Sequence, residues 1–334
     1  MKNTFQISIL DWHTFLLGLS KNNSVYVPVK TYDTIDYKLF TEDGLNIIYN
    51  VAKPVTPLKA FFLPPKENVV IEKKAYNKNI IIGIPACDLK ALEILDEIYL
   101  DETWLDLRYK ENRERAVLIG TDCFEIAENC HCTSYGIEPY PVNHADASLI
   151  LLNDSILLTI HSPKGEALFS TITHDFPVKE VQEGNLHFAD EKRKQVKKEL
   201  VEKNRLLPDY AKTGSLIKNS GEDLWEKHSR TCVSCGASAV ACPTCTCFLL
   251  IERPDFEKIR QVDACQYPGF ERIAAGEDPL RRKYIRFRNR YLCKYVWKPE
   301  DFKSVACTGC GRCIDSCIGK ISKNEIFIEM AESS

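Results

Sequence analysis

The sequence predicts an α/β domain over residues 1–206, followed by a helical, cysteine-rich domain over residues 222–334. Three observations predict this fold class. Apolar runs of strand length recur in the first part of the chain, and one of them is followed at once by a segment of helical periodicity. The 15 cysteines are clustered, with most of them after position 231. The length of 334 residues fits two domains.

Four apolar segments of the first part are expected to form strands. They are SVYVPV (24–29), NIIIGI (79–84), AVLIG (116–120) and LILLNDSILLTI (149–160), the last with a hairpin turn at Asn153 and Asp154. The segment DLKALEILDEIYL (88–100) has apolar residues at helical spacing, and Asp88 is expected to cap its amino-terminal end. The prolines of residues 54–65 predict an ordered crossing with strand character at its centre.

The two parts are joined by a charged stretch and a polar stretch. Residues 189–206 predict a charged helix with a solvated face. Residues 207–221 are the best candidate for the domain boundary, because everything beyond them is organised around cysteine.

Composition and charge exclude several classes of protein. The chain is 44% hydrophobic and 27% charged, with a net charge of −3, so no global charge draws it to nucleic acid or a membrane surface. The first residues lack the continuous apolar run of a signal peptide, and no apolar run approaches the ~18 residues of a membrane span. We therefore expect a cytoplasmic protein, in which clustered thiols indicate metal binding rather than disulfides.

The segment ACTGCGRCIDSCIG carries the clearest motif. Its cysteines have the C-x2-C-x2-C-x3-C spacing of a ferredoxin loop, which lets three thiolates reach three corners of one [4Fe-4S] cluster. They are Cys307, Cys310, Cys313 and Cys317. Gly309 and Gly311 keep this loop free of Cβ clashes. Cys317 is expected to open a following helix and to ligate a partner cluster.

The segment TCVSCGASAVACPTCTCF (231–248) is a second, altered ferredoxin loop. Cys232, Cys235 and Cys242 stand at the expected positions, but the third position is Ser238. Cross-ligation would place Cys242 with the first three cysteines of the other loop, and Cys317 with Cys232 and Cys235. Three options remain open at Ser238: its oxygen ligates iron, Cys245 or Cys247 replaces it, or the cluster lacks an iron or does not form. Zinc held by C-x2-C pairs is the alternative to iron–sulfur clusters.

Eight further cysteines fit neither loop. Four lie between the loops, at Cys245, Cys247, Cys265 and Cys293, and are enough for another metal site. Four lie early, at Cys87, Cys123, Cys130 and Cys132. Because Cys87 and Cys123 each follow a predicted strand, we expect them at the same edge of the sheet, where ligands bind in α/β proteins. Buried thiols that only fill the core are the alternative for both groups.

The stretch RRKYIRFRNRYLCKYVWK (281–298) mixes basic and aromatic residues. Tyr284, Phe287 and Tyr291 have helical spacing and are expected in the core. The arginines would supply positive charge to anionic clusters, although a nucleic-acid surface is an alternative. They are Arg281, Arg282, Arg286, Arg288 and Arg290. His131, between Cys130 and Cys132, is either a residue that supports a metal site or an exposed loop histidine.

Six segments together resemble one known family. They are GIPACDLKALEILDEIYLD, GTDCFEIAENCHCTSYG, CPTCTCF, DACQYPGFERIAAG, RFRNRYLCK and CTGCGRC, in order between about residues 54 and 320. They resemble the iron–sulfur β subunit of cytoplasmic sulfhydrogenases and the A subunit of anaerobic sulfite reductase. The resemblance implies that the early cysteines and the Cys245, Cys247, Cys265, Cys293 group belong to the functional pattern. Ser238 departs from it, because relatives carry cysteine there.

The resemblance implies an electron-transfer subunit with a ferredoxin-like dicluster domain. Such a subunit relays single electrons between a flavin-containing, NAD(P)H-oxidising subunit and a terminal hydrogenase or reductase. We expect at least two and up to four [4Fe-4S] clusters, in a cytoplasmic complex of an anaerobe. The chain has no G-x-G-x-x-G, P-loop or other nucleotide or hydrolase motif, which favours a redox subunit without a catalytic residue of its own. The alternative is a sulfite or polysulfide reductase that uses a cluster with an open coordination position.

Overall fold

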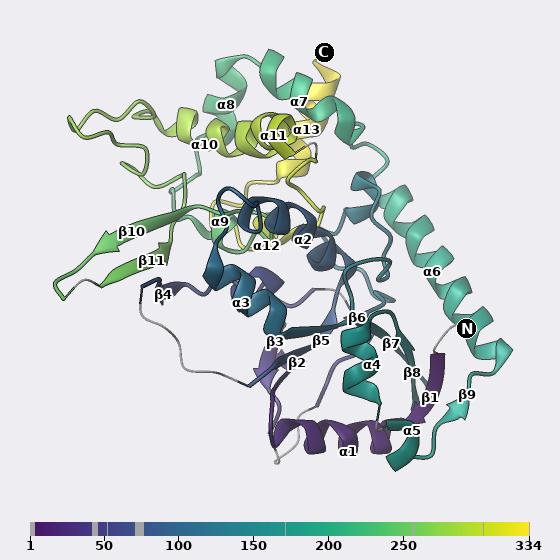
Figure 1. Ribbon diagram of the computed structural model, residues 1–334. Coiled ribbons are helices and arrows are strands. Elements are labelled where there is room, and N and C mark those ends of the chain that lie inside the picture. The colour runs from purple at the N-terminus through teal and green to yellow at the C-terminus, as the bar shows by residue number, and fades with distance from the viewer. Residues whose placement is uncertain are drawn as a thin grey trace.

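The computed structural model describes residues 4–41, 46–51, 53–70, 77–170, 172–255, 257–302 and 304–333. A mixed β-sheet with helices on its faces forms the amino-terminal part, and a group of short helices forms most of the carboxy-terminal part (Figure 1). The α/β character expected for the first part is confirmed. No helix among the described residues is long and apolar enough to cross a membrane.

The large sheet has four parallel central strands and antiparallel strands at both edges. In spatial order its strands are β3 (Thr34–Leu39), β2 (Ser24–Thr31), β5 (Asn79–Ile84), β6 (Ala116–Thr121), β7 (Ala147–Leu152), β8 (Ser155–Ile160), β1 (Thr4–Ser8) and β9 (Lys179–Glu180). The strands β2, β5, β6 and β7 run parallel. The four apolar segments expected to form strands do so, including the β7–β8 hairpin.

The pleat of β5 divides its side chains between two cores. Ile80 and Ile82 pack on one face with α1 (Ile9–Ser20), and Ile81 packs on the other face with α2 (Ala86–Tyr99) and α3 (Leu107–Arg115). At Gly83 the strand bulges, with a φ of 77°, and an added Cβ would clash with the ring of Pro28. Both faces of this strand are therefore buried, which explains its continuous apolar sequence.

Three further helices complete the first part of the chain. They are α4 (Pro163–Phe169), α5 (Ile172–Asp175) and α6 (Glu183–Lys203). The helix α6 confirms the charged helix expected over residues 189–206 and runs along one side of the molecule (Figure 1). It contributes Ala189, Val196 and Leu200 to the interior and leaves most of its charged residues in solvent.

Two local expectations are wrong. The helix expected over residues 88–100 is α2, but it begins after Pro85, and Asp88 lies in its first turn as a buried ion-pair partner of Arg312. The centre of residues 54–65 is a 3-10 helix (Leu58–Phe61) rather than a strand. Lys59 of this helix is buried and donates hydrogen bonds to the carbonyls of Ala239 and Cys245, so the segment packs against the cysteine-rich part.

The carboxy-terminal part consists of short helices around an aromatic core. The helices are α7 (Tyr210–Asn219), α8 (Glu222–Ser229), α9 (Ala237–Val240), α10 (Lys283–Leu292), α11 (Lys298–Phe302), α12 (Arg312–Asp315) and α13 (Lys323–Glu332). A π-helical turn over Cys293–Trp297 joins α10 to α11. Tyr284, Phe287 and Tyr291 are buried in the core as expected, with Trp225 and Phe327. The expected boundary 207–221 contains α7, whose Ile217 is buried in this core.

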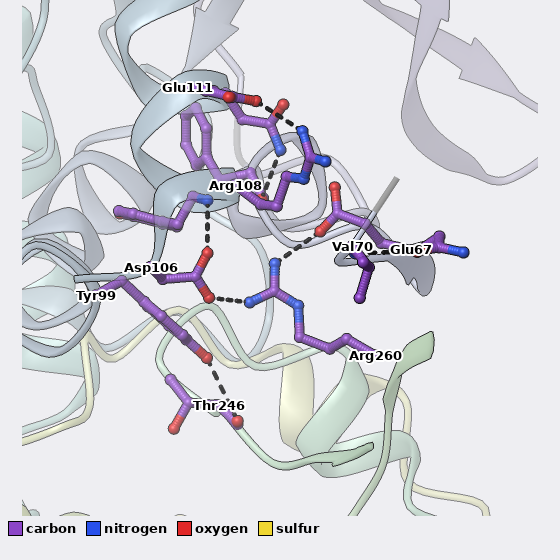
Figure 2. Close-up of polar contacts among 12 residues, drawn as sticks. Glu67, Val70, Tyr99, Asp106, Arg108, Glu111, Thr246 and Arg260 are labelled. Carbon is purple, nitrogen blue, oxygen red and sulfur yellow. Dashed lines mark hydrogen bonds and ion pairs between the residues drawn. The ribbon is translucent and has the colours of Figure 1, made fainter. Parts of the chain in front are cut away.

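A small antiparallel sheet connects the two parts of the chain. In it, β11 (Lys258–Val262) pairs with both β10 (Phe248–Glu252) and β4 (Lys66–Asn68). Figure 2 shows Arg260 of β11 reaching from this sheet toward Glu67 and Asp106. Glu67 accepts at 2.7 Å and is buried, and Asp106 is the residue that caps α3. Arg260 thus fastens the cysteine-rich part to the α/β part.

A second buried ion pair joins the parts near the cysteines. The guanidinium of Arg312 donates to both carboxylate oxygens of Asp88, at 2.6 and 2.7 Å, and to the carbonyl of Pro54. Lys53 adds an ion pair with Asp315, at 3.0 Å. These contacts hold the ferredoxin loop after Cys307 against the carboxyl ends of the central strands.

Candidate functional site

The structure gathers the cysteines into sets at the junction of the two parts. We name the sets by their members. The central set is Cys242, Cys307, Cys310 and Cys313; the serine set is Cys232, Cys235, Ser238 and Cys317; the amino-terminal set is Cys87, Cys123, Cys130 and Cys132; and the outer set is Cys245, Cys247, Cys265 and Cys293. No disulfide joins any of the cysteines, all of which lie in the described residues.

The central set lines one hollow, to which the two ferredoxin loops both contribute. Three of its cysteines come from the loop before and around α12, and Cys242 follows α9 in the other loop. These are the residues that cross-ligation predicts to share a cluster. The central set therefore has the donor type and number that a [4Fe-4S] cluster requires.

Gly309 and Gly311 allow the central loop to pack closely on its neighbour. Both have positive φ, 62° and 75°. A Cβ on Gly309 would overlap the carbonyl of His131, and one on Gly311 would overlap the carbonyl of Asn129. The sequence suggested that glycine keeps the loop clear for a cluster, and the structure adds that glycine makes room for residues 129–132.

Three buried cations line the central hollow. They are Arg290, Lys294 and Lys323, which are 5%, 4% and 3% exposed. Lys294 Nζ lies 3.0 Å from Cys242 Sγ, and Lys323 Nζ lies 3.9 Å from Cys307 Sγ. Buried positive charge of this kind compensates the negative charge of thiolates and of an iron–sulfur cluster.

The same cations favour the thiolate form of two central cysteines. Burial alone would raise the pKa of Cys307, but Lys323, Lys294 and the hydroxyl of Tyr295 outweigh burial and lower it. A hydrogen bond from Cys245, together with Lys294 and Lys59, holds the pKa of Cys242 well below its ordinary value. Thiolate is the form that ligates iron, so these surroundings suit a ligand.

Of the five arginines expected to supply this charge, only Arg290 lines the hollow. Arg286 is buried and donates to backbone carbonyls, and Arg288 donates to the carbonyl of Ile217. Arg281 and Arg282 are exposed. Lys294 and Lys323 were not expected from the sequence to line this hollow. Lys294 directly follows Cys293 in the basic stretch, which is a signal that could have identified it.

The serine set lines a second hollow, and Ser238 stands in it beside the three cysteines. Ser238 Oγ donates a hydrogen bond to Gln266 Oε1, at 2.7 Å. Cys235 is exposed, so this hollow lies nearer to solvent than the central one. Cys245 and Cys247 line a different hollow, which does not favour the option that either of them replaces Ser238.

The position of Cys317 differs from the expectation in one respect. The helix α12 contains Cys313 and ends two residues before Cys317, so Cys317 follows a helix instead of opening one. Its amide donates to the carbonyl of Ile314, and its Sγ accepts from the amide of Ile321 at 3.3 Å. The short helix still turns Cys317 toward the serine set and away from the central hollow.

The amino-terminal set lines a third hollow, at the carboxyl ends of β5 and β6. Cys87 follows β5 and Cys123 follows β6, so the sheet brings these two cysteines together as expected. Cys130 and Cys132 reach the same hollow from the loop after β6. Lys53 Nζ lies 3.6 Å from Cys130 Sγ and supplies a positive charge here.

His131 is fully buried, which rules out the alternative of an exposed loop histidine. Its side chain lines the central hollow, although its neighbours Cys130 and Cys132 face the amino-terminal one. The ring contacts the carbonyl of Asn129 and, at 2.8 Å, Lys323 Nζ. Burial and the charge of Lys323 hold the pKa of His131 well below its ordinary value, so the ring is neutral.

The outer set lies on the far side of Cys242. The thiols of Cys247 and Cys265 are hydrogen-bonded to each other, and Cys245 is hydrogen-bonded to Cys242. The hydrogen bond from Cys265, with the amide of Cys265 and Lys298, lowers the pKa of Cys247 to about 6. Cys293 is close enough to Cys247 and Cys242 to interact electrostatically with both. Electrostatic interactions thus link these four thiols, and their role as ligands of a further metal site stays a prediction.

The arrangement of three sets around hollows fits iron–sulfur clusters. Among the described residues, no three His, Cys, Asp or Glu side chains converge tightly enough to hold one metal ion. Three of the sets instead stand around hollows, with glycine-bearing loops and buried lysines beside them. A cluster is larger than an ion, and its ligands are correspondingly further apart.

The comparisons with known proteins agree with this chemistry. Residues 231–321 match the family model of a 4Fe-4S dicluster domain. The chain is also 28% identical over 333 residues to a protein named sulfhydrogenase 2 subunit beta from Pyrococcus furiosus, and the match covers 95% of each chain. The dicluster domain indicates at least two [4Fe-4S] clusters. The resemblance inferred from the sequence is confirmed: the chain is an iron–sulfur protein that carries a 4Fe-4S dicluster domain and is similar along nearly its whole length to the β subunit of a sulfhydrogenase.

Proposed function

We propose that the chain is the electron-transfer subunit of a multi-subunit oxidoreductase of the sulfhydrogenase type. The observation that carries this proposal is the close succession of thiol sets: Cys310 and Cys313 of the central set also line the neighbouring hollows. Clusters held at such spacing exchange single electrons without a substrate. When bound, they supply one-electron oxidation and reduction, and the residues of the chain hold them and set their potentials.

The ligands are assigned by set. The central set holds one [4Fe-4S] cluster, with Lys294, Arg290 and Lys323 as its positive surroundings. The serine set holds another, with Ser238 Oγ as the fourth ligand in place of cysteine. The amino-terminal and outer sets hold two more. Support for these two comes from their grouping and, for the amino-terminal set, from the position of the hollow at the carboxyl edge of the sheet.

The domains follow the same division. Residues 1–206 form an α/β domain with its own cysteine-ligated site, and residues 222–334 form a ferredoxin-like dicluster domain. The two cysteine loops each contain a short helix before their last cysteine, α9 before Cys242 and α12 before Cys317, and this repetition supports the ferredoxin-like description. The helix α7 then lies at the join, packed on the dicluster domain.

The partners are proposed from the resemblance to a sulfhydrogenase β subunit. One partner is a flavin-containing subunit that oxidises NAD(P)H, and the other is a terminal hydrogenase or reductase subunit. The proposed complex is cytoplasmic. The basic stretch 281–298 forms α10 and the turn after it, with Tyr284, Phe287 and Tyr291 in the core, and this favours a structural role over the alternative of a nucleic-acid surface. The comparisons do not favour the alternative of a sulfite or polysulfide reductase.

Spectroelectrochemistry of the anaerobically purified chain tests the proposal. A relay subunit takes up and releases electrons reversibly, in one-electron steps, without consuming sulfite or polysulfide when reduced methyl viologen is the donor. Turnover of either compound by the isolated chain would replace the relay with a catalytic function. Cys307→Ser should abolish the reversible one-electron steps of the central set, whereas Ser215→Cys, at an exposed position, should leave them unchanged. This pair of results would assign these steps to the central set.

A further inference from the structure

The sets are not arranged in a line. The serine, amino-terminal and outer sets each approach the central set, and each does so through a different central residue. Cys313 lines both the central and the serine hollows, and Cys310 lines both the central and the amino-terminal hollows. Cys242 Sγ lies 3.0 Å from Nζ of Lys294, which directly follows Cys293 of the outer set, and Cys242 also interacts electrostatically with Cys245 of that set. Each peripheral set is therefore in direct contact with the central set.

The peripheral sets share no hollow with one another, although the residues that follow Cys265 join the outer set to the serine set. Ser238 Oγ donates to Gln266 Oε1 at 2.7 Å, and the hydroxyl of Tyr267 donates to the carbonyl of Cys235 at 3.2 Å. Among the described residues, the hollow of the serine set and the hollow of the amino-terminal set share no lining residue. The hollow beside Cys245 and Cys247 shares none with either. The ferredoxin loop around Gly309 and Cys310 stands between the amino-terminal set and the others. A path from the amino-terminal set to either of the other peripheral sets thus crosses the central set.

Buried charge is concentrated at the same point. Arg290, Lys294 and Lys323 all line the central hollow, whereas Asp88 neutralises the nearby guanidinium of Arg312. Two of the three also face the serine hollow, and Lys294 interacts electrostatically with Cys245 of the outer set. In a buried, low-dielectric site these fixed charges favour an added electron at the central cluster over the peripheral ones.

Backbone contacts make one of the connections rigid. The amide of His131, between Cys130 and Cys132, donates to the carbonyl of Gly309 at 2.9 Å, next to Cys310. Asn129 Nδ2 donates to Asp315 at 2.7 Å, and Lys53 pairs with the same carboxylate. The loop of the amino-terminal set is thus fixed against the loop of the central set from several directions.

We propose that the central set is a three-way junction, through which an electron that arrives at any one peripheral cluster reaches either of the other two. This inference rests on the proposed function, because it requires a cluster at each set. Each transfer oxidises one cluster and reduces its neighbour by one electron, with no bond made or broken. A junction, unlike a linear relay, allows the subunit to serve three redox partners, or two partners and an electron store.

Pairwise isolation of the clusters tests the junction. Three full-length variants are made, each with two peripheral sets disabled, so that the central set remains with one neighbour. Each set is disabled by two substitutions: C232S with C235S for the serine set, C123S with C130S for the amino-terminal set, and C247S with C265S for the outer set. Each variant therefore carries two of these three pairs. Each variant is loaded with iron and sulfide anaerobically, reduced with dithionite and examined by EPR for spin–spin interaction between its two remaining clusters.

The junction predicts an interaction spectrum in all three variants, because each peripheral cluster neighbours the central one. A linear relay predicts that at least one variant gives only the sum of two isolated signals, and that result overturns the junction while leaving the relay intact. Iron analysis separates the two levels of the proposal. A peripheral set whose removal leaves the iron content unchanged holds no cluster, which overturns both its assignment and the junction. Where a variant does not fold, a second pair of substitutions disables the same set. The pair C87S with C132S serves for the amino-terminal set, and C245S with C293S serves for the outer set.

Discussion

Lys294 Nζ donates a hydrogen bond to Cys242 Sγ over 3.0 Å, and both side chains are buried. Lys294 lies in the π-helical turn between α10 and α11, a local distortion that often marks functional positions. Its ammonium also donates to Thr244 Oγ1 and to the carbonyl of Ala306. A strongly hydrated cation is buried only where negative charge compensates it, and here that charge belongs to the central set.

Replacement of Lys294 by methionine should therefore lower the reduction potential of the central cluster. Without the buried positive charge, the equilibrium constant for one-electron reduction of the central cluster falls about tenfold or more. A tenfold fall lowers the reduction potential by about 59 mV. The measurement is an EPR-monitored redox titration. Lys227→Met is the matched control, since Lys227 is exposed and pairs with Glu329 on the surface. Equal shifts in the two variants would show that Lys294 does not act on a cluster.

Ser238→Cys should raise the potential of a different cluster without adding one. Oxygen is a harder donor than thiolate and stabilises the oxidised iron, so its replacement by sulfur favours reduction. We expect an altered EPR signal and an upward shift for the serine set, with unchanged iron content. Ser215→Cys, on the exposed face of α7, is the control for an added thiol. If Ser238→Cys changes neither the spectrum nor the potential, Ser238 is not a ligand.

Asp88→Asn should destabilise the junction of the two domains. It leaves the guanidinium of Arg312 buried without its countercharge, which costs about 3–5 kcal/mol in the free energy of unfolding. Anaerobic denaturant titration measures the loss. The double variant Asp88→Leu with Arg312→Met should recover much of it, because no unpaired charge remains. Asp101→Asn, at an exposed turn, should change stability by less than about 0.5 kcal/mol.

The neutral, buried ring of His131 predicts a pH dependence of stability. Its pKa is lowered well below the ordinary value in the folded protein by burial and by Lys323, whereas in the unfolded chain it returns to about 6.5. Below that pH the unfolded chain binds a proton that the folded protein does not, so stability falls as the pH falls. The loss is about 1 kcal/mol between pH 7 and pH 5.5. His131→Gln should remove this part of the dependence, and a variant of exposed His174 should not.

Much of the fold could be predicted because it depends on local patterns. The strand NIIIGI is apolar from Ile80 to Ile84 except for Gly83, which is typical of a strand buried on both faces, and it is the central strand β5. The spacing of Tyr284, Phe287 and Tyr291 predicted the buried face of α10. The spacing of the cysteines around Cys310 predicted the central set, since a loop this short determines which thiols can converge.

The remainder depends on contacts between distant residues. Asp88 has the local features of a helix cap, but Arg312, 224 positions away, binds it inside the protein. Residues 66–68 carry no strand signal of their own and form β4 because β11 offers an edge to pair with. The sequence does not indicate that His131 lines the central hollow while Cys130 and Cys132 line the amino-terminal one. The packing of Gly309 on the loop of His131 places the ring in the central hollow.

We assign the thiol sets of this chain to iron–sulfur clusters. Analysis of iron and acid-labile sulfide in the anaerobically purified protein measures the clusters themselves. We expect about eight or more of each per chain, corresponding to two or more [4Fe-4S] clusters, and no stoichiometric zinc. A chain that retains zinc and no labile sulfide under these conditions would contradict it.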